Sequence, residues 1–174
     1  MIFTHINSNN SKPGQIRLFH YTTFSRLLKI LTDESISPAN LHVAPPERPV
    51  VWFSRRLDWE PTATPALITN GQHQSLTFAD LTQIDTPSRI EVNQHAAPLD
   101  WRSWRKTSGV TSRTVKGLEK SALRLNASVA DWRMSFEPVT VEKWLDIELF
   151  IGGQWRGMDD PIVKSRVLVN TDPS

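Results

Sequence analysis

The chain has 174 residues, of which 39% are apolar, so it can bury one hydrophobic core but is short for two ordinary domains. It contains no cysteine, which excludes disulfides and thiolate-bound zinc. The formal charge of +2 is too small to indicate a nucleic-acid partner from composition alone.

Histidine spacing and hydropathy limit the class of protein further. The five histidines are dispersed, and none is followed by another at the i+3 or i+4 spacing of a helical metal site. No apolar run approaches the roughly 18 residues of a membrane span, and the start Met1-Ile2-Phe3-Thr4-His5 lacks the basic region of a signal peptide. These features predict a cytoplasmic protein, in the host or in a target cell, without a metal site or a membrane partner.

The first residues are turn formers. Asn, Ser, Pro and Gly dominate residues 6–15, and such residues disfavour regular structure. We therefore expect a flexible arm over residues 1–15, ahead of the first strand.

A strand followed by a helix comes next. Residues 17–23 carry His20 out of an apolar strand toward a helix start, where Thr22 or Thr23 can act as the cap. Apolar residues then recur between residues 24 and 31 at the spacing of one helical face. This pattern predicts a helix packed on a sheet, with a polar histidine facing a cleft at the strand end.

A second short strand is predicted over Val50–Ser54. Three prolines precede it and favour an extended loop, and Arg55 and Arg56 follow it directly. Two guanidinium groups at a strand end can bind a pyrophosphate, although solvated surface arginines are the commoner explanation.

The middle of the chain has weaker periodicity. Prolines, threonines and a glycine interrupt residues 57–85, which we interpret as an irregular insertion, and residues 88–92 alternate like a strand. Asp100 can cap a short helix over residues 101–106, and apolar spacing predicts another helix over residues 114–126. We treat residues 57–130 together as an insertion with helices.

Two late strands each carry a glutamate. In residues 132–137 alternation places Trp132, Met134 and Phe136 on one face and Glu137 on the other. Glu148 alternates in the same way within a strand over residues 146–151, and a Gly152-Gly153 hairpin turn follows it. An edge strand is expected over residues 166–169.

The pattern His20-Tyr21-Thr22, amphipathic helix, Trp52-Phe53-Ser54 and late glutamate resembles the ADP-ribosyltransferase superfamily, which includes diphtheria-type toxins and poly(ADP-ribose) polymerases. The resemblance covers roughly residues 15–56 and 130–152. It implies a single α+β domain over residues 1–174, with small mixed or antiparallel sheets and flanking helices around an NAD cleft. The same resemblance implies that NAD is the substrate.

The resemblance also implies roles for individual residues. In that superfamily a first-strand histidine holds the adenosine-side ribose, an aromatic ring packs on the nicotinamide, and a late-strand glutamate completes the site. The implied catalytic residues are Glu137, His20 and Ser54. The implied NAD-binding residues are His20, Tyr21, Thr22, Trp52, Phe53, Ser54 and Arg55.

Several points stay open at this level. Tyr21 is the only tyrosine, so the later tyrosine of many family members is missing, and Trp52 or Phe53 would have to stack on the nicotinamide. Glu148 is a rival to Glu137 for the catalytic carboxylate. Both glutamates are also compatible with ordinary strand positions, and a half-buried structural histidine would explain His20 equally well.

The helices of the middle segment are rich in cations and tryptophan. Such residues can neutralise phosphates and stack on bases, although core tryptophans and solvated cations are the more common explanation. As an acceptor-binding region we consider the cations Arg102, Arg105, Lys106, Arg113 and Lys116.

The sequence therefore predicts an NAD-dependent ADP-ribosyltransferase that modifies a protein or a nucleic acid, in the setting of a toxin or of a phage or mobile-element effector. Two other classes remain. One is a non-catalytic module that binds nucleic acid or protein on a similar scaffold. The other is a related NAD-using enzyme, either an NAD hydrolase or an RNA 2′-phosphotransferase.

Overall fold

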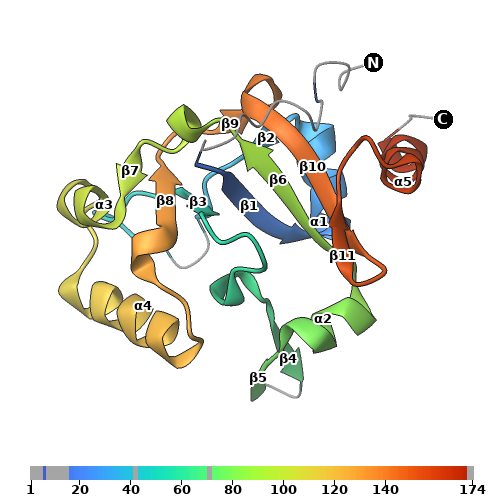
Figure 1. The fold of residues 1–174 in the computed structure, drawn as a ribbon. Coiled ribbons are helices and arrows are strands. Elements are labelled where there is room, and N and C mark those ends of the chain that lie inside the picture. Colours follow the sequence, from blue (N-terminus) through green and yellow to red (C-terminus); the bar gives the residue numbers. More distant parts are fainter. Residues whose placement is uncertain (1–5, 7–15, 41–42, 70–71, 172–174) are drawn as a thin grey trace.

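The computed structural model describes residues 6, 16–40, 43–69 and 72–171. Its centre is a seven-stranded antiparallel sheet with the strand order β11-β10-β6-β1-β3-β8-β7 (Figure 1). The strands of this sheet are β1 (Leu18–Thr23), β3 (Val51–Ser54), β6 (Pro87–Val92), β7 (Leu99–Asp100), β8 (Trp132–Ser135), β10 (Trp144–Ile151) and β11 (Gln154–Arg156). Two small strand pairs lie outside it, β2 (Ser35–Ile36) with β9 (Val139–Thr140) and β4 (Ala66–Thr69) with β5 (Gln72–Ser75).

One face of the sheet carries the largest apolar cluster. Helix α1 (Phe24–Asp33) contributes Leu27 and Leu31 to it, and α5 (Pro161–Thr171) contributes Val163 and Val167. Both pairs have the i, i+4 spacing that places two side chains on the same side of a helix. They pack against apolar residues of β1 and β6, among them Leu18, Ile90 and Val92.

The opposite face is covered by two separate groups of elements. Helices α3 (Trp101–Thr107) and α4 (Ser112–Arg124) pack over β3 and β8 through a tryptophan-rich cluster. The short 3₁₀ helix η2 (Pro61–Ala63) and helix α2 (Phe78–Ile84) pack over β1 through Phe19, Tyr21, Trp59 and Leu81. Figure 1 shows α3 and α4 beside the β8 end of the sheet and α2 with the β4–β5 hairpin below its centre.

The remaining 3₁₀ segments lie in connections, namely η3 (Gln94–Ala96), η4 (Val129–Asp131) and η5 (Val141–Lys143). Asp100 caps α3 by accepting a hydrogen bond from the backbone N–H of Ser103 at 2.7 Å, as its position in the sequence predicts. Thr23 occupies the N-cap position of α1, but its side chain makes no capping hydrogen bond to the helix backbone.

Strand β1 is paired unequally on its two sides. All six of its residues pair with β6, from Leu18 opposite Val92 to Thr23 opposite Pro87. On the other side one register pair, Phe19 opposite Ser54, joins it to β3. The sheet therefore opens between β1 and β3 beyond this pair, and the opening exposes side chains near the sheet centre.

The α+β class is confirmed, and several expectations about elements are corrected. Residues 166–169 belong to helix α5 and are not an edge strand, because Val163 and Val167 bury a helical stripe that a four-residue apolar run cannot reveal. Residues 87–92 form a central strand, so residues 57–130 are not wholly an insertion. The arm expected over residues 1–15 lies outside the described residues, apart from the buried Ile6.

Candidate functional site

A cavity of about 640 Å³ lies where the sheet opens, between the two groups of elements that cover this face. This volume is within the range of about 300–1,000 Å³ typical of small-molecule sites. Strands β1, β3 and β8 contribute Phe19, His20, Tyr21, Trp52, Phe53, Ser54 and Trp132 to its lining. Its walls come from residues 60–66 on one side and from Leu118, Ser121, Arg124 and Leu125 of α4 and its C-terminal end on the other.

His20 occupies the gap between β1 and β3. Its Nδ1 lies 3.0 Å from the backbone carbonyl oxygen of Trp52. Because a carbonyl oxygen only accepts, this bond places the ring proton on Nδ1 and leaves Nε2 as an acceptor. Burial lowers the pKa of His20, and the bond to the Trp52 carbonyl opposes this effect only partly. The imidazole is therefore neutral at pH 7.

Aromatic rings border the histidine. Phe53 meets the His20 ring edge-on, with 5.9 Å between the ring centroids. Trp52 is half-buried, and its ring is held edge-on by Trp104 at 5.2 Å and by Trp132 at 5.6 Å. A tryptophan fixed by two others presents a rigid flat surface to the cavity, which suits stacking on a heteroaromatic ring.

A buried serine–glutamate pair lies in the same cavity. Ser54 Oγ donates to a carboxylate oxygen of Glu60 at 2.8 Å, and the other oxygen accepts from Thr62 Oγ1 at 2.6 Å and from Thr62 N at 3.3 Å. Glu60 is 5% exposed and occupies the N-cap position of η2. A carboxylate has about four acceptor positions, so Glu60 can accept a further hydrogen bond from a ligand.

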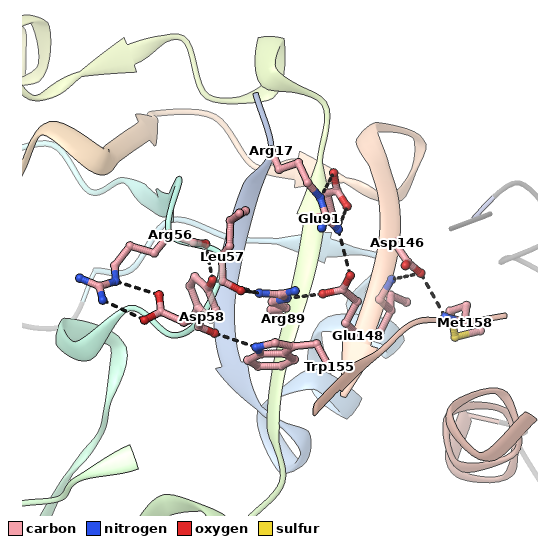
Figure 2. Close-up of polar contacts among 12 residues, drawn as sticks. Arg17, Arg56, Leu57, Asp58, Arg89, Glu91, Asp146, Glu148, Trp155 and Met158 are labelled. Carbon is pink, nitrogen blue, oxygen red and sulfur yellow. Dashed lines mark hydrogen bonds and ion pairs between the residues drawn. The ribbon is translucent and has the colours of Figure 1, made fainter. Parts of the chain in front are cut away.

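The segment before Glu60 is fixed by three side chains of the sheet (Figure 2). Each donates a hydrogen bond to a backbone carbonyl of one of three consecutive residues. Tyr21 donates to the carbonyl of Arg56, Arg89 to that of Leu57, and Trp155 to that of Asp58 at 2.7 Å. Because three successive carbonyls are held, residues 56–58 have little freedom, and the direction in which the chain reaches Glu60 is determined by the sheet.

Arg89 belongs to a buried ion network on the β6 and β10 side of β1 (Figure 2). It pairs with Glu148, which also contacts Arg17 at 2.9 Å, and Arg17 pairs with Glu91. Arg89 stands directly opposite Glu148 in the strand register, and its guanidinium lies 4.0 Å from the centroid of Phe19 and 4.2 Å from that of Trp155. Charges buried this deeply are stable only when paired, so this network is structural.

Asp146 lies at the far end of this network. Its Oδ1 accepts from the backbone N–H of Ile147 at 2.8 Å and of Met158 at 3.1 Å, which connects β10 to the turn before α5. Burial, assisted by the nearby carboxylates of Glu148 and Glu91, raises the pKa of Asp146 to about 6. Its ionised form therefore carries a cost at neutral pH.

The structure brings together His20, Tyr21, Trp52, Phe53 and Ser54, but not the other residues implied by the resemblance. Glu137 is exposed, beyond the end of β8, and does not line the cavity. Ser54 faces Trp132 in the register, and Glu137 follows Trp132 by five residues, on the order of 15 Å along an extended chain. The convergence of His20, Ser54 and Glu137 on one cleft is thus not observed.

The rival carboxylate and two of the expected NAD contacts also lie elsewhere. Glu148 is held in the ion network and does not line the cavity. Thr22 is buried outside the cavity lining, and Arg55 lines a different hollow. Two arginines that the resemblance did not indicate, Arg26 of α1 and Arg124 of α4, line the cavity and are exposed.

The cations of the middle segment are exposed on α3 and α4, namely Arg102, Arg105, Lys106, Arg113 and Lys116. Arg105 contacts Glu119 at 3.4 Å. The tryptophans of the same segment, Trp101 and Trp104, are buried in the core and are not available for stacking on a ligand. Helix α4 lines the cavity and also carries Arg113 and Lys116, whereas Arg102, Arg105 and Lys106 lie on α3, which is not part of the described lining.

Sequence reasoning missed Glu60 because it lies in a stretch without periodicity. A local signal was present, since Pro61 favours the first position of a helix and so places Glu60 at the N-cap, although glutamate is not among the preferred cap residues. That signal predicts the cap but not the contact with Ser54, which depends on how the chain returns over β3. The roles of Arg17 and Arg89 had no such signal.

Comparison with protein-family models, curated proteins and solved structures found no significant match. Of the helices in the described ranges, none combines the length and the apolar character needed to cross a bilayer. Within the same ranges, no three His, Asp or Glu side chains are grouped so that they could hold a metal ion.

Proposed function

We propose that the cavity binds NAD and that the protein is an NAD-dependent ADP-ribosyltransferase acting on a macromolecule. One observation carries the proposal. A neutral imidazole with a free acceptor nitrogen, a rigid tryptophan ring and a buried hydrogen-bonded carboxylate line one cavity of about 640 Å³. These three groups match the ribose hydroxyls, the flat rings and the developing positive charge of NAD.

Cleavage of the bond between nicotinamide and ribose does not need a strong proton donor. When the bond between the ribose C1′ and the nicotinamide nitrogen breaks, the bonding electrons stay on that nitrogen and neutralise the pyridinium, while positive charge develops on the ribose. A nearby carboxylate stabilises this charge. In our proposal Glu60 has this role in place of Glu137, and an acceptor nucleophile then bonds to C1′ and loses its proton.

The other lining residues supply binding and orientation. His20 Nε2 can accept a hydrogen bond from a ribose hydroxyl, and Trp52 can cover the nicotinamide or adenine ring. Arg26 and Arg124 approach the cavity from two different helices and can neutralise the pyrophosphate. Arg55, which with Arg56 could bind a pyrophosphate on sequence grounds, lines a different hollow and has no part in this proposal.

The acceptor in this proposal is a protein or a nucleic acid that docks on the cations of α3 and α4. Helix α4 forms part of the cavity wall and also carries Arg113 and Lys116, which favours a large acceptor over water. Transfer to water instead would make the protein an NAD hydrolase with the same site.

The test is binding and turnover of NAD. We expect calorimetry to detect NAD binding by the wild-type protein, and labelled NAD incubated with cell extract to transfer label to a macromolecule. An Arg26→Gln/Arg124→Gln variant should bind NAD about tenfold more weakly, because neither glutamine can form a charge-assisted hydrogen bond to the pyrophosphate. Arg102→Gln/Arg113→Gln removes the same charge outside the cavity and should bind NAD normally.

Each other outcome contradicts part of the proposal. Absence of NAD binding by the folded wild-type protein would leave a non-catalytic binding module. Release of nicotinamide without label on any macromolecule would indicate an NAD hydrolase. An equal decrease of affinity in the two double variants would show that NAD does not occupy the cavity.

A further inference from the structure

Among the described residues, a second hollow of about 440 Å³ is lined by two arginines and by no acidic residue. Its lining consists of Ile16, Leu18, Arg55, Gln94, His95, Ala97, Pro98 and Arg133. Ser54 and Trp132 line the cavity described above. Arg55 directly follows Ser54 in the chain, and Arg133 directly follows Trp132. Because successive side chains of a strand alternate between faces, Arg55 and Arg133 project to the face of the β3–β8 pair opposite to that of Ser54 and Trp132.

The two arginines are diagonal neighbours. Arg133 stands opposite Phe53 in the register of β3 and β8, and Arg55 lies two residues beyond Phe53 on the same face. Diagonal neighbours in an antiparallel pair are about 7–8 Å apart, within reach of long side chains. Two like charges in such positions repel, so the arrangement is unfavourable unless an anion lies between them.

The hydrogen bonding of these guanidinium groups is incomplete. Arg55 Nε is buried and has no hydrogen-bond partner among the described residues. Arg133 Nη1 donates to the backbone carbonyls of Ala130 at 3.1 Å and Trp132 at 2.6 Å. Within the part of the chain that the structure describes, neither arginine forms an ion pair with a carboxylate.

Two aspartates are near but do not complete the site. Asp100 stands opposite Arg133 in the register, and its carboxylate is engaged at 2.7 Å in capping α3. Asp131 attracts Arg133 only at longer range. Despite both, burial and the charge of Arg55 lower the pKa of Arg133, so the carboxylates do not compensate for the two cations.

We propose that Arg55 and Arg133 form a binding site for a phosphate group, at which the outer N–H groups of both guanidiniums donate to phosphate oxygens. Planar guanidinium groups bind phosphate through paired hydrogen bonds, and two of them can hold one tetrahedral anion. Gln94 and His95 at the rim supply further donors. Among the described residues, none lines both this hollow and the larger cavity.

The experiment measures phosphate binding in low-salt buffer, with inorganic phosphate in one arm and a short single-stranded oligonucleotide without a terminal phosphate in the other. Binding is followed by chemical-shift perturbation of backbone amides in the wild-type protein and in the Arg55→Gln and Arg133→Gln variants. Lys164→Gln, which removes one exposed positive charge on α5, is the matched control.

We expect each arginine variant to bind inorganic phosphate at least about tenfold more weakly, because it loses charge-assisted hydrogen bonds to the phosphate. Lys164→Gln should bind phosphate as the wild type does. The same decrease for the oligonucleotide would extend the site to phosphodiesters, and a decrease for inorganic phosphate alone would restrict it to free phosphate groups. The proposal is overturned if the wild-type protein binds neither probe near Arg55, or if folded Arg55→Gln and Arg133→Gln bind as the wild type does.

The thermal unfolding temperatures of Arg55→Gln and Arg133→Gln provide a second test of the proposal. Removing one of two repelling cations should leave the thermal unfolding temperature in phosphate-free buffer unchanged or raise it. In the wild-type protein phosphate should raise that temperature, because it binds only the folded state. If the unfolding temperatures of both variants rise as much with phosphate as that of the wild type, the arginines do not bind it.

Discussion

The two sides of β1 differ in how they use polar residues. On the β6 side every residue of β1 is paired, and the polar groups are ionised and joined to one another, as in Arg89 with Glu148. On the β3 side the pairing opens after one register pair, and the cavity contains a neutral histidine and one carboxylate held by neutral donors. Buried groups that satisfy one another stabilise the fold, whereas groups with unused hydrogen-bonding positions can act on a ligand.

The largest effect is expected from breaking the ion network. In the wild-type protein the side chains of Arg89 and Glu148 are only 4% and 10% exposed. Glu148→Gln therefore leaves the buried charge of Arg89 without its ionic partner. We expect a decrease of about 3 kcal/mol in the free energy of unfolding, measured by urea denaturation. Glu137→Gln neutralises an exposed glutamate and should change this free energy by less than about 0.5 kcal/mol. Equal stability of the two variants would refute a structural role for the network.

The second effect separates chemistry from folding. Glu60→Gln should lower the rate of NAD cleavage by about a hundredfold or more, because a carboxylate that stabilises developing positive charge becomes neutral. Its unfolding temperature should change little, since the amide oxygen still accepts from Ser54 or Thr62. Glu137→Gln is the control and should cleave NAD at the wild-type rate. The reverse pattern would return the catalytic role to Glu137.

The third effect is a pH-dependent gain of stability expected when the charge of Asp146 is removed. The pKa of Asp146 rises from 3.8 to about 6 in the folded protein, which corresponds to about 3 kcal/mol at most. The folded protein holds this proton more tightly than the unfolded chain, so Asp146 should cost stability progressively as pH rises from about 4 to 6, and fully above that.

Asp146→Asn keeps an oxygen that can accept from Ile147 and Met158 while it removes the charge. We expect a gain of about 2 kcal/mol at pH 7 and no gain near pH 4, measured by denaturant titration across this range. A variant that is less stable than the wild type at pH 7 would mean that the carboxylate is favourably ionised.

The smallest effect concerns the surface beyond the cavity. Reversing the exposed charges of Lys106, Arg113 and Lys116 should weaken acceptor binding, by about tenfold near 0.1 M salt, while NAD affinity stays unchanged. For a nucleic-acid acceptor the log–log salt slope should also fall by roughly one for each phosphate that the variant no longer neutralises. Binding that is insensitive to salt and to the triple reversal would leave these cations as an ordinary solvated surface.

Local signals in the sequence were enough to predict several elements. Periodicity predicted the helices near residues 24–31 and 114–126 and the strands near residues 88–92 and 146–151, and Asp100 was identified as a cap from its position alone. His20, Trp52 and Ser54, which the resemblance to the ADP-ribosyltransferases singled out, line one cavity, and their roles there stay a prediction.

The choice of the carboxylate that joins them required the folded structure. Glu60, Glu137 and Glu148 are indistinguishable as residue types, and their environments follow from strand register and chain path. A buried arginine pairs with Glu148, the end of β8 leaves Glu137 in solvent, and three carbonyl contacts direct the chain so that Glu60 meets Ser54. Long-range pairing of this kind has no local periodicity, because it depends on which strands become neighbours after the chain folds.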